Sequence, residues 1–345
     1  MARLPIEKFN LQSLIDKVWE NEAKPYRSSN IGASSIGSPC LRSTFLNFRW
    51  VSPVEKFKGQ MLRLFDVGTR EEDIMVKNLK KVGCDIRYTG KDQLKMQIAP
   101  HLTCRPDGVI YSGLPEQTSP MNFECKTMNR NNFEMVEKQG VRNAKPEYYD
   151  QAQCEMYGES TEIKEYVDTT LFVALCKDDS RIYAEIIRYD VERMNIILKH
   201  AKSIVFDDAV PEEYSIDPEI NPCRYCNNSV FCHVSHETRE INCRTCAWSK
   251  PEEDSTWSCK VYPGSPIPYE VQIKGCKCHS MNPMFVPYEV DASQSKGWKL
   301  AYKGADGTIV MNGLGGVPSS DLWKHMAACS EKVDEGADPL AVTFD

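Results

Sequence analysis

The chain has 345 residues, of which 41% are hydrophobic, and a formal net charge of −7. This composition excludes a disordered or fibrous protein, and the length favours two or three domains. The longest apolar stretches are too short to cross a bilayer, and the acidic balance argues against a general nucleic-acid binder. The charge is uneven, however, because residues 1–105 carry 18 Lys and Arg against 11 Asp and Glu.

The N-terminal segment shows the periodicity of an amphipathic helix. Its apolar residues recur at helical spacing, namely Leu11, Leu14, Ile15, Val18 and Trp19. This pattern predicts a helix that faces the core and not a signal peptide, so we expect a cytoplasmic protein. Fifteen cysteines in such a compartment indicate thiols or metal ligands and not disulfides.

Helices and strands alternate through the next part of the chain. Helical patterns occupy residues 41–50, 59–82, 145–160 and 191–208, and strand patterns occupy 84–90, 93–100, 105–113, 121–128, 165–179 and 181–190. Strands bracketed by helices predict an α/β or α+β fold with one central mixed sheet. Beyond residue 240 we expect a Cys-rich module, a hairpin over 299–313 with Asp306 and Gly307 in its turn, and a last helix over 319–332.

The most informative stretch for chemistry is RPDG followed by FECKT. Side chains alternate along a strand, so Glu124 and Lys126 share one face while Cys125 points to the other. Asp107 begins the preceding strand and can meet them at the edge of the sheet. Two carboxylates of this kind hold Mg²⁺ or Mn²⁺, and a neighbouring lysine orients water and stabilises charge on a phosphate. Taken alone, however, such a pair is more often a solvated ion pair.

Two helical segments add polar residues to this set. Glu72 lies in register with the apolar residues of its helix, and a buried carboxylate favours a cation nearby. Tyr149, Gln153 and Tyr157 share one face of the helix over 145–160, from which they could bind a phosphate backbone or a metal-bound water.

Two groups of cysteines follow. Cys223, Cys226 and Cys232 have the C-x2-C-x5-C spacing of a metal or cluster site that lacks its fourth ligand. The second group favours a structural zinc site, with Cys243, Cys246, Cys259 and Cys276 as ligands and Cys278 or His279 as substitutes. The alternative for the second group is a set of reduced thiols without a metal.

The order of these motifs resembles that of the PD-(D/E)XK nuclease superfamily. The resemblance is greatest to its RecB-like and lambda-exonuclease-like branch, particularly to phage exonucleases. GTREE is similar to the GxxxE/H motif, RPDG and FECKT to the two catalytic motifs, and QCEMY to the QxxxY motif. The resemblance runs from about Asn30 to about Val290. It implies a restriction-endonuclease-like core that hydrolyses DNA phosphodiesters with a metal-activated water.

The resemblance also implies roles for individual residues. Asp107, Glu124 and the carbonyl of Cys125 would bind Mg²⁺ or Mn²⁺, and Lys126 would position water. Glu72, Gln153 and Tyr157 would support them, although the branch often has histidine where Glu72 stands.

In some RecB-like nucleases a cysteine before the core completes a [4Fe–4S] site, which here implies Cys40 with Cys223, Cys226 and Cys232. Zinc in the same thiolates, or a Cys40 without a ligand role, are the alternatives.

We therefore expect a nuclease domain over 1–236, a zinc module over 237–292 and a hairpin, helix and acidic tail over 293–345. The predicted function is an exonuclease for linear double-stranded DNA in phage recombination or DNA degradation. A single-strand annealing or other recombination protein is the expected partner, and an oligomer is compatible with the sequence. The alternatives are a catalytically silent DNA-binding protein, an endonuclease of the same fold, and a redox enzyme for small molecules.

Overall fold

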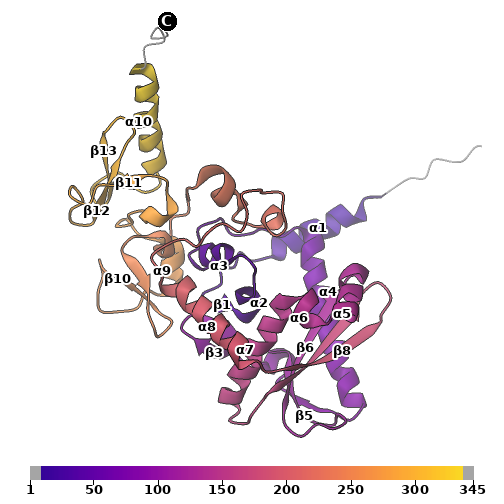
Figure 1. Ribbon diagram of the computed structural model, residues 1–345. Helices are drawn as coiled ribbons and strands as arrows, with labels where there is room; N and C mark the ends of the chain where they lie inside the picture. Colours follow the sequence, from indigo (N-terminus) through magenta and orange to yellow (C-terminus); the bar gives the residue numbers. More distant parts are fainter. Residues whose placement is uncertain (1–8, 337–345) are drawn as a thin grey trace, which may run out of the picture.

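A mixed five-stranded sheet organises the larger part of the chain in the computed structural model, which describes residues 9–336 (Figure 1). Its strands lie in the order β2 (Asp85–Arg87), β5 (Gly108–Ser112), β6 (Met121–Met128), β7 (Thr169–Cys176) and β8 (Ile182–Arg188). Strands β6 and β7 are parallel, and the other neighbours are antiparallel. The mixed α/β class expected from the sequence is confirmed.

Helices cover both faces of this sheet. They are α4 (Gly59–Lys81) on one face and α5 (Arg130–Gln139), α6 (Val141–Ala144) and α7 (Pro146–Glu162) on the other. Strand alternation explains the division, because Phe123 and Cys125 of β6 pack with α4 whereas Met128 packs with α5 and α7.

A second, smaller sheet packs beside the first. It consists of β1 (Ile31–Gly32), β4 (Leu102–Cys104) and β3 (Met96–Ala99), and it shares a core with α2 (Ala33–Ile36), α3 (Leu41–Phe48) and α8 (Val191–Phe206). Strands β1 and β4 were not predicted, because two or three residues are too few to show a period of two.

The Cys-rich segment contains little regular structure. Its elements are β9 (Ser249–Pro251), β10 (Trp257–Cys259) and α9 (Tyr269–Lys274). Trp257 is buried against Phe48 of α3, with ring centroids 5.5 Å apart, and the buried Arg244 donates hydrogen bonds to the carbonyls of Phe48 and Ser29, each at 2.9 Å. The predicted boundary at residue 236 therefore crosses a core that both sides share.

The end of the described chain forms a small sheet of β11 (Glu289–Val290), β12 (Lys299–Lys303) and β13 (Ile309–Gly313), followed by α10 (Leu322–Gly336). The predicted hairpin is confirmed. Gly307 has a positive φ of 81°, and the carboxylate of Asp306 accepts the amide of Thr308 at 2.8 Å. The acidic tail expected beyond it lies outside the described residues.

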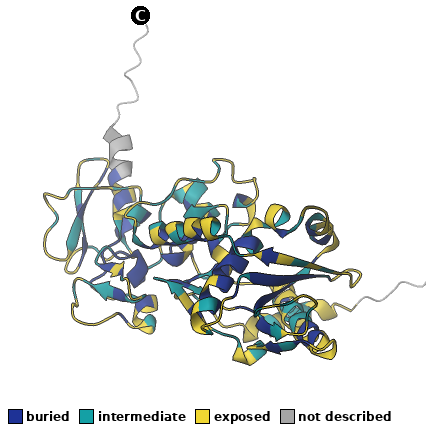
Figure 2. Cartoon of the chain, turned by 60° about the horizontal axis from the view of Figure 1, so that its bottom comes forward, coloured by how far each residue is buried: buried dark blue, intermediate teal, exposed yellow. Residues whose placement is uncertain are grey.

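The prediction of a core-facing N-terminal helix is wrong. Helix α1 (Leu11–Glu22) forms, but Leu11, Leu14 and Val18 are each more than half exposed (Figure 2). Its contact with α4 is polar and close instead. Asp16 pairs with Arg63, and a Cβ at Gly59 would lie only 2.4 Å from the Cα of Asp16. No helix among residues 9–336 is long and apolar enough to cross a membrane.

Candidate active site and thiol clusters

Strand β6 places the predicted glutamate and lysine side by side. Glu124 and Lys126 lie on the face covered by α7, where the Glu124 side chain is 1% exposed and forms an ion pair with the ammonium of Lys126. The strand is held on both sides, by β5 and by β7. The backbone pairing therefore orients both side chains before any ligand binds.

Asp107 joins them from the neighbouring strand. Gly108 at the start of β5 lies opposite Phe123 of β6, which brings the Asp107 carboxylate within 2.9 Å of the backbone nitrogen of Cys125. The amide of Cys125 thus donates a hydrogen bond to Asp107. This contact positions Asp107 beside the backbone of Cys125, where the charge of Glu124 also acts on it.

Glu72 of α4 reaches the same place through a bridging amide. Gln93 donates from Nε2 to Glu72 Oε1 at 2.9 Å and to Asp107 Oδ1 at 3.3 Å. The structure therefore brings together Glu72, Asp107, Glu124 and Lys126. Glu72 comes from α4, Asp107 directly precedes β5, and Glu124 and Lys126 lie on β6.

The electrostatics of this group favour a bound cation. Burial, followed by the charges of Glu124 and Glu72, raises the pKa of Asp107 well above its usual value. Burial and then Glu124 also raise the pKa of Glu72. Burial alone would lower the pKa of Lys126, but the charges of Glu124 and Asp107 outweigh it and raise that pKa. A single ammonium among three carboxylates leaves an excess of negative charge.

The hydrogen bonding at Glu124 agrees with this interpretation. Its Oε1 pairs with Lys126, whereas its buried Oε2 has no hydrogen-bond partner among the described residues. A hard cation such as Mg²⁺ or Mn²⁺ prefers carboxylate and carbonyl oxygens. The donor set of Asp107, Glu124 and the Cys125 carbonyl fits such an ion.

Gln153 and Tyr157 require a correction, because the structure directs them elsewhere. Gln153 accepts the amide of Asp190 at 2.7 Å and donates to the carbonyl of Arg188 at 3.1 Å, so it connects α7 to the turn between β8 and α8. Tyr157 lies on the same face of α7 and is partly exposed. The shared face of these residues was predicted correctly, but it is not the face toward Glu124.

The side chains that α7 presents to the site are Gln151 and Tyr148. Gln151 donates from Nε2 to Glu124 Oε1 and to Glu155 Oε1, both at 2.8 Å. The ring of Tyr148 lies 5.2 Å from the Lys126 ammonium. The sequence analysis missed both residues. The available signal was the helical spacing of Tyr148, Gln151, Glu155 and Glu159, a polar stripe on a helix that is otherwise buried.

The polar stripe continues away from the site. Asn122 of β6 donates to Glu155 at 3.0 Å, and Glu159 is fully buried with no partner for either carboxyl oxygen among residues 9–336. Burial and the charge of Glu124 raise the pKa of both glutamates well above the usual value.

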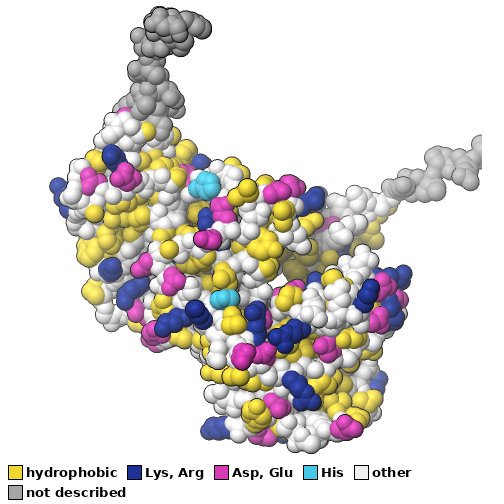
Figure 3. Space-filling model, viewed as in Figure 1, with side chains coloured by type: hydrophobic (Ala, Val, Ile, Leu, Met, Phe, Trp, Pro, Cys, Tyr) yellow, Lys and Arg dark blue, Asp and Glu magenta, His cyan; other side chains and the backbone are white. Residues whose placement is uncertain are grey.

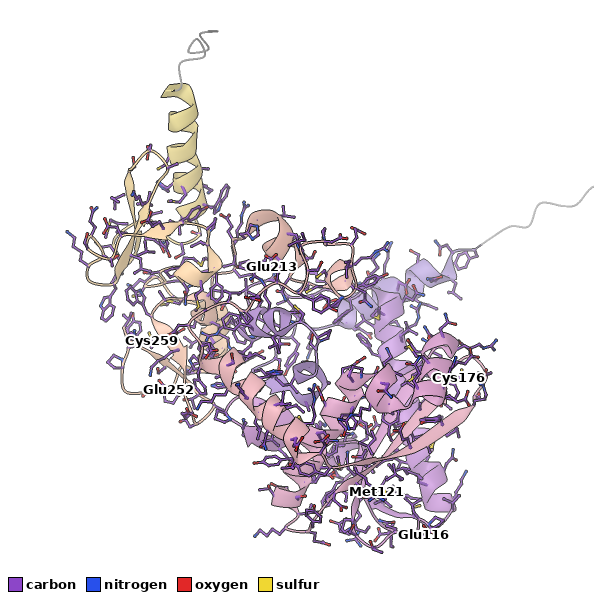
Figure 4. All side chains as sticks on the ribbon, viewed as in Figure 1. Glu116, Met121, Cys176, Glu213, Glu252 and Cys259 are labelled. Carbon is purple, nitrogen blue, oxygen red and sulfur yellow. The ribbon has the colours of Figure 1, made fainter. Side chains whose placement is uncertain are left out.

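The first cysteine group lies around one cavity. Cys40, Cys223, Cys226 and Cys232 all line a space of about 290 Å³ next to Arg42 and Glu213. Cys40 precedes α3, whereas the other three lie in the turns that follow α8, so the tertiary fold joins distant parts of the chain. Figure 4 labels Glu213 beside this group and Cys259 in the second one, and both lie away from Met121 at the start of β6.

Hydrogen-bond donors surround the sulfurs of this first group. Arg42 Nε lies 3.3 Å from the Cys232 sulfur, the amide of Ser43 lies 3.4 Å from the Cys40 sulfur, and the amide of Asn228 lies 3.4 Å from the Cys226 sulfur. Such donors stabilise thiolates and cluster-bound sulfur. The four thiols therefore line one space together with these donors, but they do not form a preassembled metal site among the described residues.

The second cysteine group also converges. Burial and then the charges of Cys246, Cys276 and Cys259 raise the pKa of the Cys243 thiol to about 12, so all four lie within electrostatic range of one another. Burial raises the pKa of the Cys246 thiol to about 11, and the backbone groups of Trp248 and Ser280 oppose this rise. These thiols interact electrostatically with one another but do not form a preassembled metal site among residues 9–336.

The two suggested substitutes have other partners. Cys278 lies 3.3 Å from the hydroxyl of Tyr262. The ring of His279 is buried, with Nδ1 at 2.8 Å from Ser319 Oγ and Nε2 at 3.1 Å from the carbonyl of Asn242. His279 is therefore directed away from a metal by its own hydrogen bonds. Among residues 9–336, no three or more His, Cys, Asp or Glu side chains lie in an arrangement that could hold a metal ion.

Comparison with known proteins gives distant similarities of fold. No family model and no curated protein sequence matches this chain. The solved structure of SSO0001 is 13% identical, with a TM-score of 0.40 over 64% of this chain and 96% of that one. An alkaline exonuclease (LHK-Exo) from Laribacter hongkongensis is 15% identical, with a TM-score of 0.35 over 55% of this chain and 90% of its own. Its complex with dAMP is 17% identical, with a TM-score of 0.36 and the same coverage.

Proposed function

We propose that the protein is a metal-dependent deoxyribonuclease that hydrolyses phosphodiester bonds. The observation that carries the proposal is the convergence of Asp107, directly before β5, with Glu124 and Lys126 of the central strand β6. One oxygen of the buried Glu124 has no hydrogen-bond partner among the described residues. Paired carboxylates and a lysine of this kind serve phosphodiester hydrolysis through a divalent ion.

The residues of the site have three roles, namely binding the metal, orienting the water and holding the carboxylates. Asp107, Glu124 and the carbonyl of Cys125 would hold Mg²⁺ or Mn²⁺, which supplies a water of lowered pKa and neutralises charge on the phosphate. Lys126 keeps its proton at the working pH and would orient the attacking water and stabilise the developing negative charge. Gln93 holds Asp107 and Glu72, and Gln151 holds Glu124, so the carboxylates are oriented in advance.

The finer assignment rests on the resemblance of the motifs. It favours an exonuclease that acts on linear double-stranded DNA in phage recombination or DNA degradation, with an annealing protein as partner. A catalytically silent DNA-binding protein and an endonuclease are the alternatives, and the experiment below separates all three.

The two thiol groups would act as structural sites. A [4Fe–4S] cluster held by Cys40, Cys223, Cys226 and Cys232 would join α3 to the turns after α8 and thereby restrict the unfolded chain. Zinc held by Cys243, Cys246, Cys259 and Cys276 would stabilise a segment that has few backbone hydrogen bonds between strands. Iron with visible absorbance in anaerobically purified protein supports the cluster, whereas stoichiometric zinc without iron in the first group contradicts it.

The test of function compares linear and closed circular DNA in the presence of Mg²⁺ or Mn²⁺. Anaerobically purified wild type is expected to degrade linear DNA, and Asp107→Asn and Lys126→Ala are expected to lose activity by about 100- to 1000-fold. Lys202→Ala, on the exposed surface of α8, is the matched control and should retain activity. Cleavage of circles would indicate an endonuclease, and binding without cleavage by wild type would indicate the silent DNA-binding protein.

A further inference from the structure

Two clefts meet at Tyr26. The outer cleft lies between residues 20–26 and 55–62 and has about 1080 Å³ of empty space. The inner cleft lies between residues 26–34, the strands β3 and β4, and α7, and has about 1130 Å³. Gln151, which donates to Glu124, lines the inner cleft, so this cleft reaches within one hydrogen bond of the proposed active site. Because Tyr26 lines both clefts, we treat the two clefts as one path.

Basic side chains line this path. Lys24, Lys56 and Lys58 border the outer cleft, and Lys95 and Arg105 border the inner one. In the described part of the chain, none of the four lysines has a carboxylate within 4.0 Å of its ammonium. Unpaired cations along a groove favour a polyanionic ligand.

The opposing charge in the path is smaller. Its carboxylates are Glu20, Glu55 and Glu155. Glu155 accepts hydrogen bonds from Asn122 at 3.0 Å and from Gln151 at 2.8 Å, and Glu20 accepts the backbone amide of Gly59 at 2.8 Å. On the face seen in Figure 3, by contrast, Lys and Arg alternate with Asp and Glu without a large patch of one sign. The lining of the two clefts therefore holds more Lys and Arg than Asp and Glu.

Aromatic side chains stand beside the cations. Tyr26 is 73% exposed at the junction of the two clefts, and Phe57 is 39% exposed in the outer cleft. Aromatic rings in a basic groove stack with unpaired bases, whereas the bases of a duplex are already stacked on one another. The combination favours a single strand over a duplex.

We propose that the two clefts form a track for one unpaired strand of DNA, with Tyr26 as a stacking platform for a base. The lysines would bind the phosphates, and the strand would end at the carboxylates next to Gln151. This inference rests on the proposed nuclease function for the identity of the nucleic acid, and it names the form in which that substrate approaches the site.

The test measures DNA binding without cleavage, with Asp107→Asn as the background for every protein. The probes are a short fluorescein-labelled oligothymidylate and a blunt duplex of the same length. Adding Tyr26→Ala should weaken single-strand binding by about 10-fold, because one base–aromatic stack is lost. Tyr26→Phe should retain it. Tyr166→Ala removes a tyrosine that is 68% exposed outside both clefts, and it should not change binding.

The lysines give an independent measurement. Lys58→Ala combined with Lys95→Ala should reduce the slope of log Kd against log salt by about 1.4, since each phosphate contact to a single strand contributes about 0.7. Lys202→Ala should leave the slope unchanged.

Equal single-strand affinities of Tyr26→Ala and Tyr166→Ala would overturn the track, as would an equal loss of duplex and single-strand binding. These results are separate from the proposed function. If wild type cleaves DNA but Tyr26→Ala binds single strands as before, the track is wrong and the nuclease proposal stands. If Tyr26→Ala weakens binding but wild type does not cleave DNA, the nuclease proposal is wrong and the track stands.

Discussion

The centre of the five-stranded sheet and the Cys-rich segment hold their polar residues by different means. In the sheet, Glu124 and Lys126 lie on the eight-residue central strand β6, which is hydrogen-bonded to neighbours on both sides. In the Cys-rich segment, Cys243 lies in a three-residue 3₁₀ turn and Cys259 at the end of a three-residue strand. The strand ladder orients the carboxylates without a metal, whereas short turns supply few backbone bonds. We therefore expect a metal to contribute catalysis in the first region and stability in the second.

The largest expected effect is the loss of the second thiol site. Cys243→Ser should abolish binding of one zinc and lower the thermal midpoint strongly, because a structural zinc contributes on the order of 10 kcal/mol to folding. Metal content and the thermal unfolding midpoint are the measurements, with and without a chelator.

Cys84→Ser is the matched control, since Cys84 is a buried thiol that packs with α4 outside both groups. It should retain zinc and the response to chelator. If Cys243→Ser retained full zinc content, the difference drawn between the two regions would be wrong.

The next effect separates two glutamines of α7. Gln151→Ala should lower nuclease activity or Mg²⁺ affinity by about 10- to 100-fold, because the side chain orients a metal-binding carboxylate. Gln153→Ala should lower the free energy of unfolding by about 1–3 kcal/mol, because the Asp190 amide and the Arg188 carbonyl lose the hydrogen bonds that Gln153 makes to them. It should leave the Mg²⁺ dependence of activity unchanged.

Activity over a range of Mg²⁺ concentrations, together with denaturant unfolding of both variants, gives the comparison. The reverse assignment, with Gln153 controlling Mg²⁺ affinity and Gln151 only stability, would restore the role that the sequence pattern alone predicts for Gln153.

The smallest effect concerns pH. The pKa of Glu159 is raised well above 4.5 in the folded protein by burial and by Glu124. The folded state therefore binds this proton more tightly than the unfolded state. Its contribution to stability is complete below pH 4.5 and is lost as the pH rises through the folded pKa, at up to about 1.4 kcal/mol per pH unit.

Glu159→Gln should remove this part of the pH dependence and make the variant more stable than wild type above that window. Unfolding by urea at a series of pH values measures the difference. Parallel curves for the two proteins would show that Glu159 is not protonated on folding.

The sequence by itself determined the local order of the molecule. Alternation in FECKT placed Glu124 and Lys126 on one face, Asp306 and Gly307 formed the expected turn, and the main helices and long strands formed where their periodicity indicated. These features depend on residues close together in the sequence, so a periodicity of two or 3.6 residues is enough to predict them.

Tertiary structure decided which faces meet. The pattern of α1 is amphipathic, yet its apolar stripe stays exposed because its contact with α4 is made by Asp16, Arg63 and Gly59. The period of α7 shows two polar faces, and only the packing of that helix on β6 selects Gln151 over Gln153. The meeting of Cys40 with Cys223, of Glu72 with Asp107, and of the two clefts at Tyr26 likewise depends on contacts between segments distant in sequence, which no local period encodes.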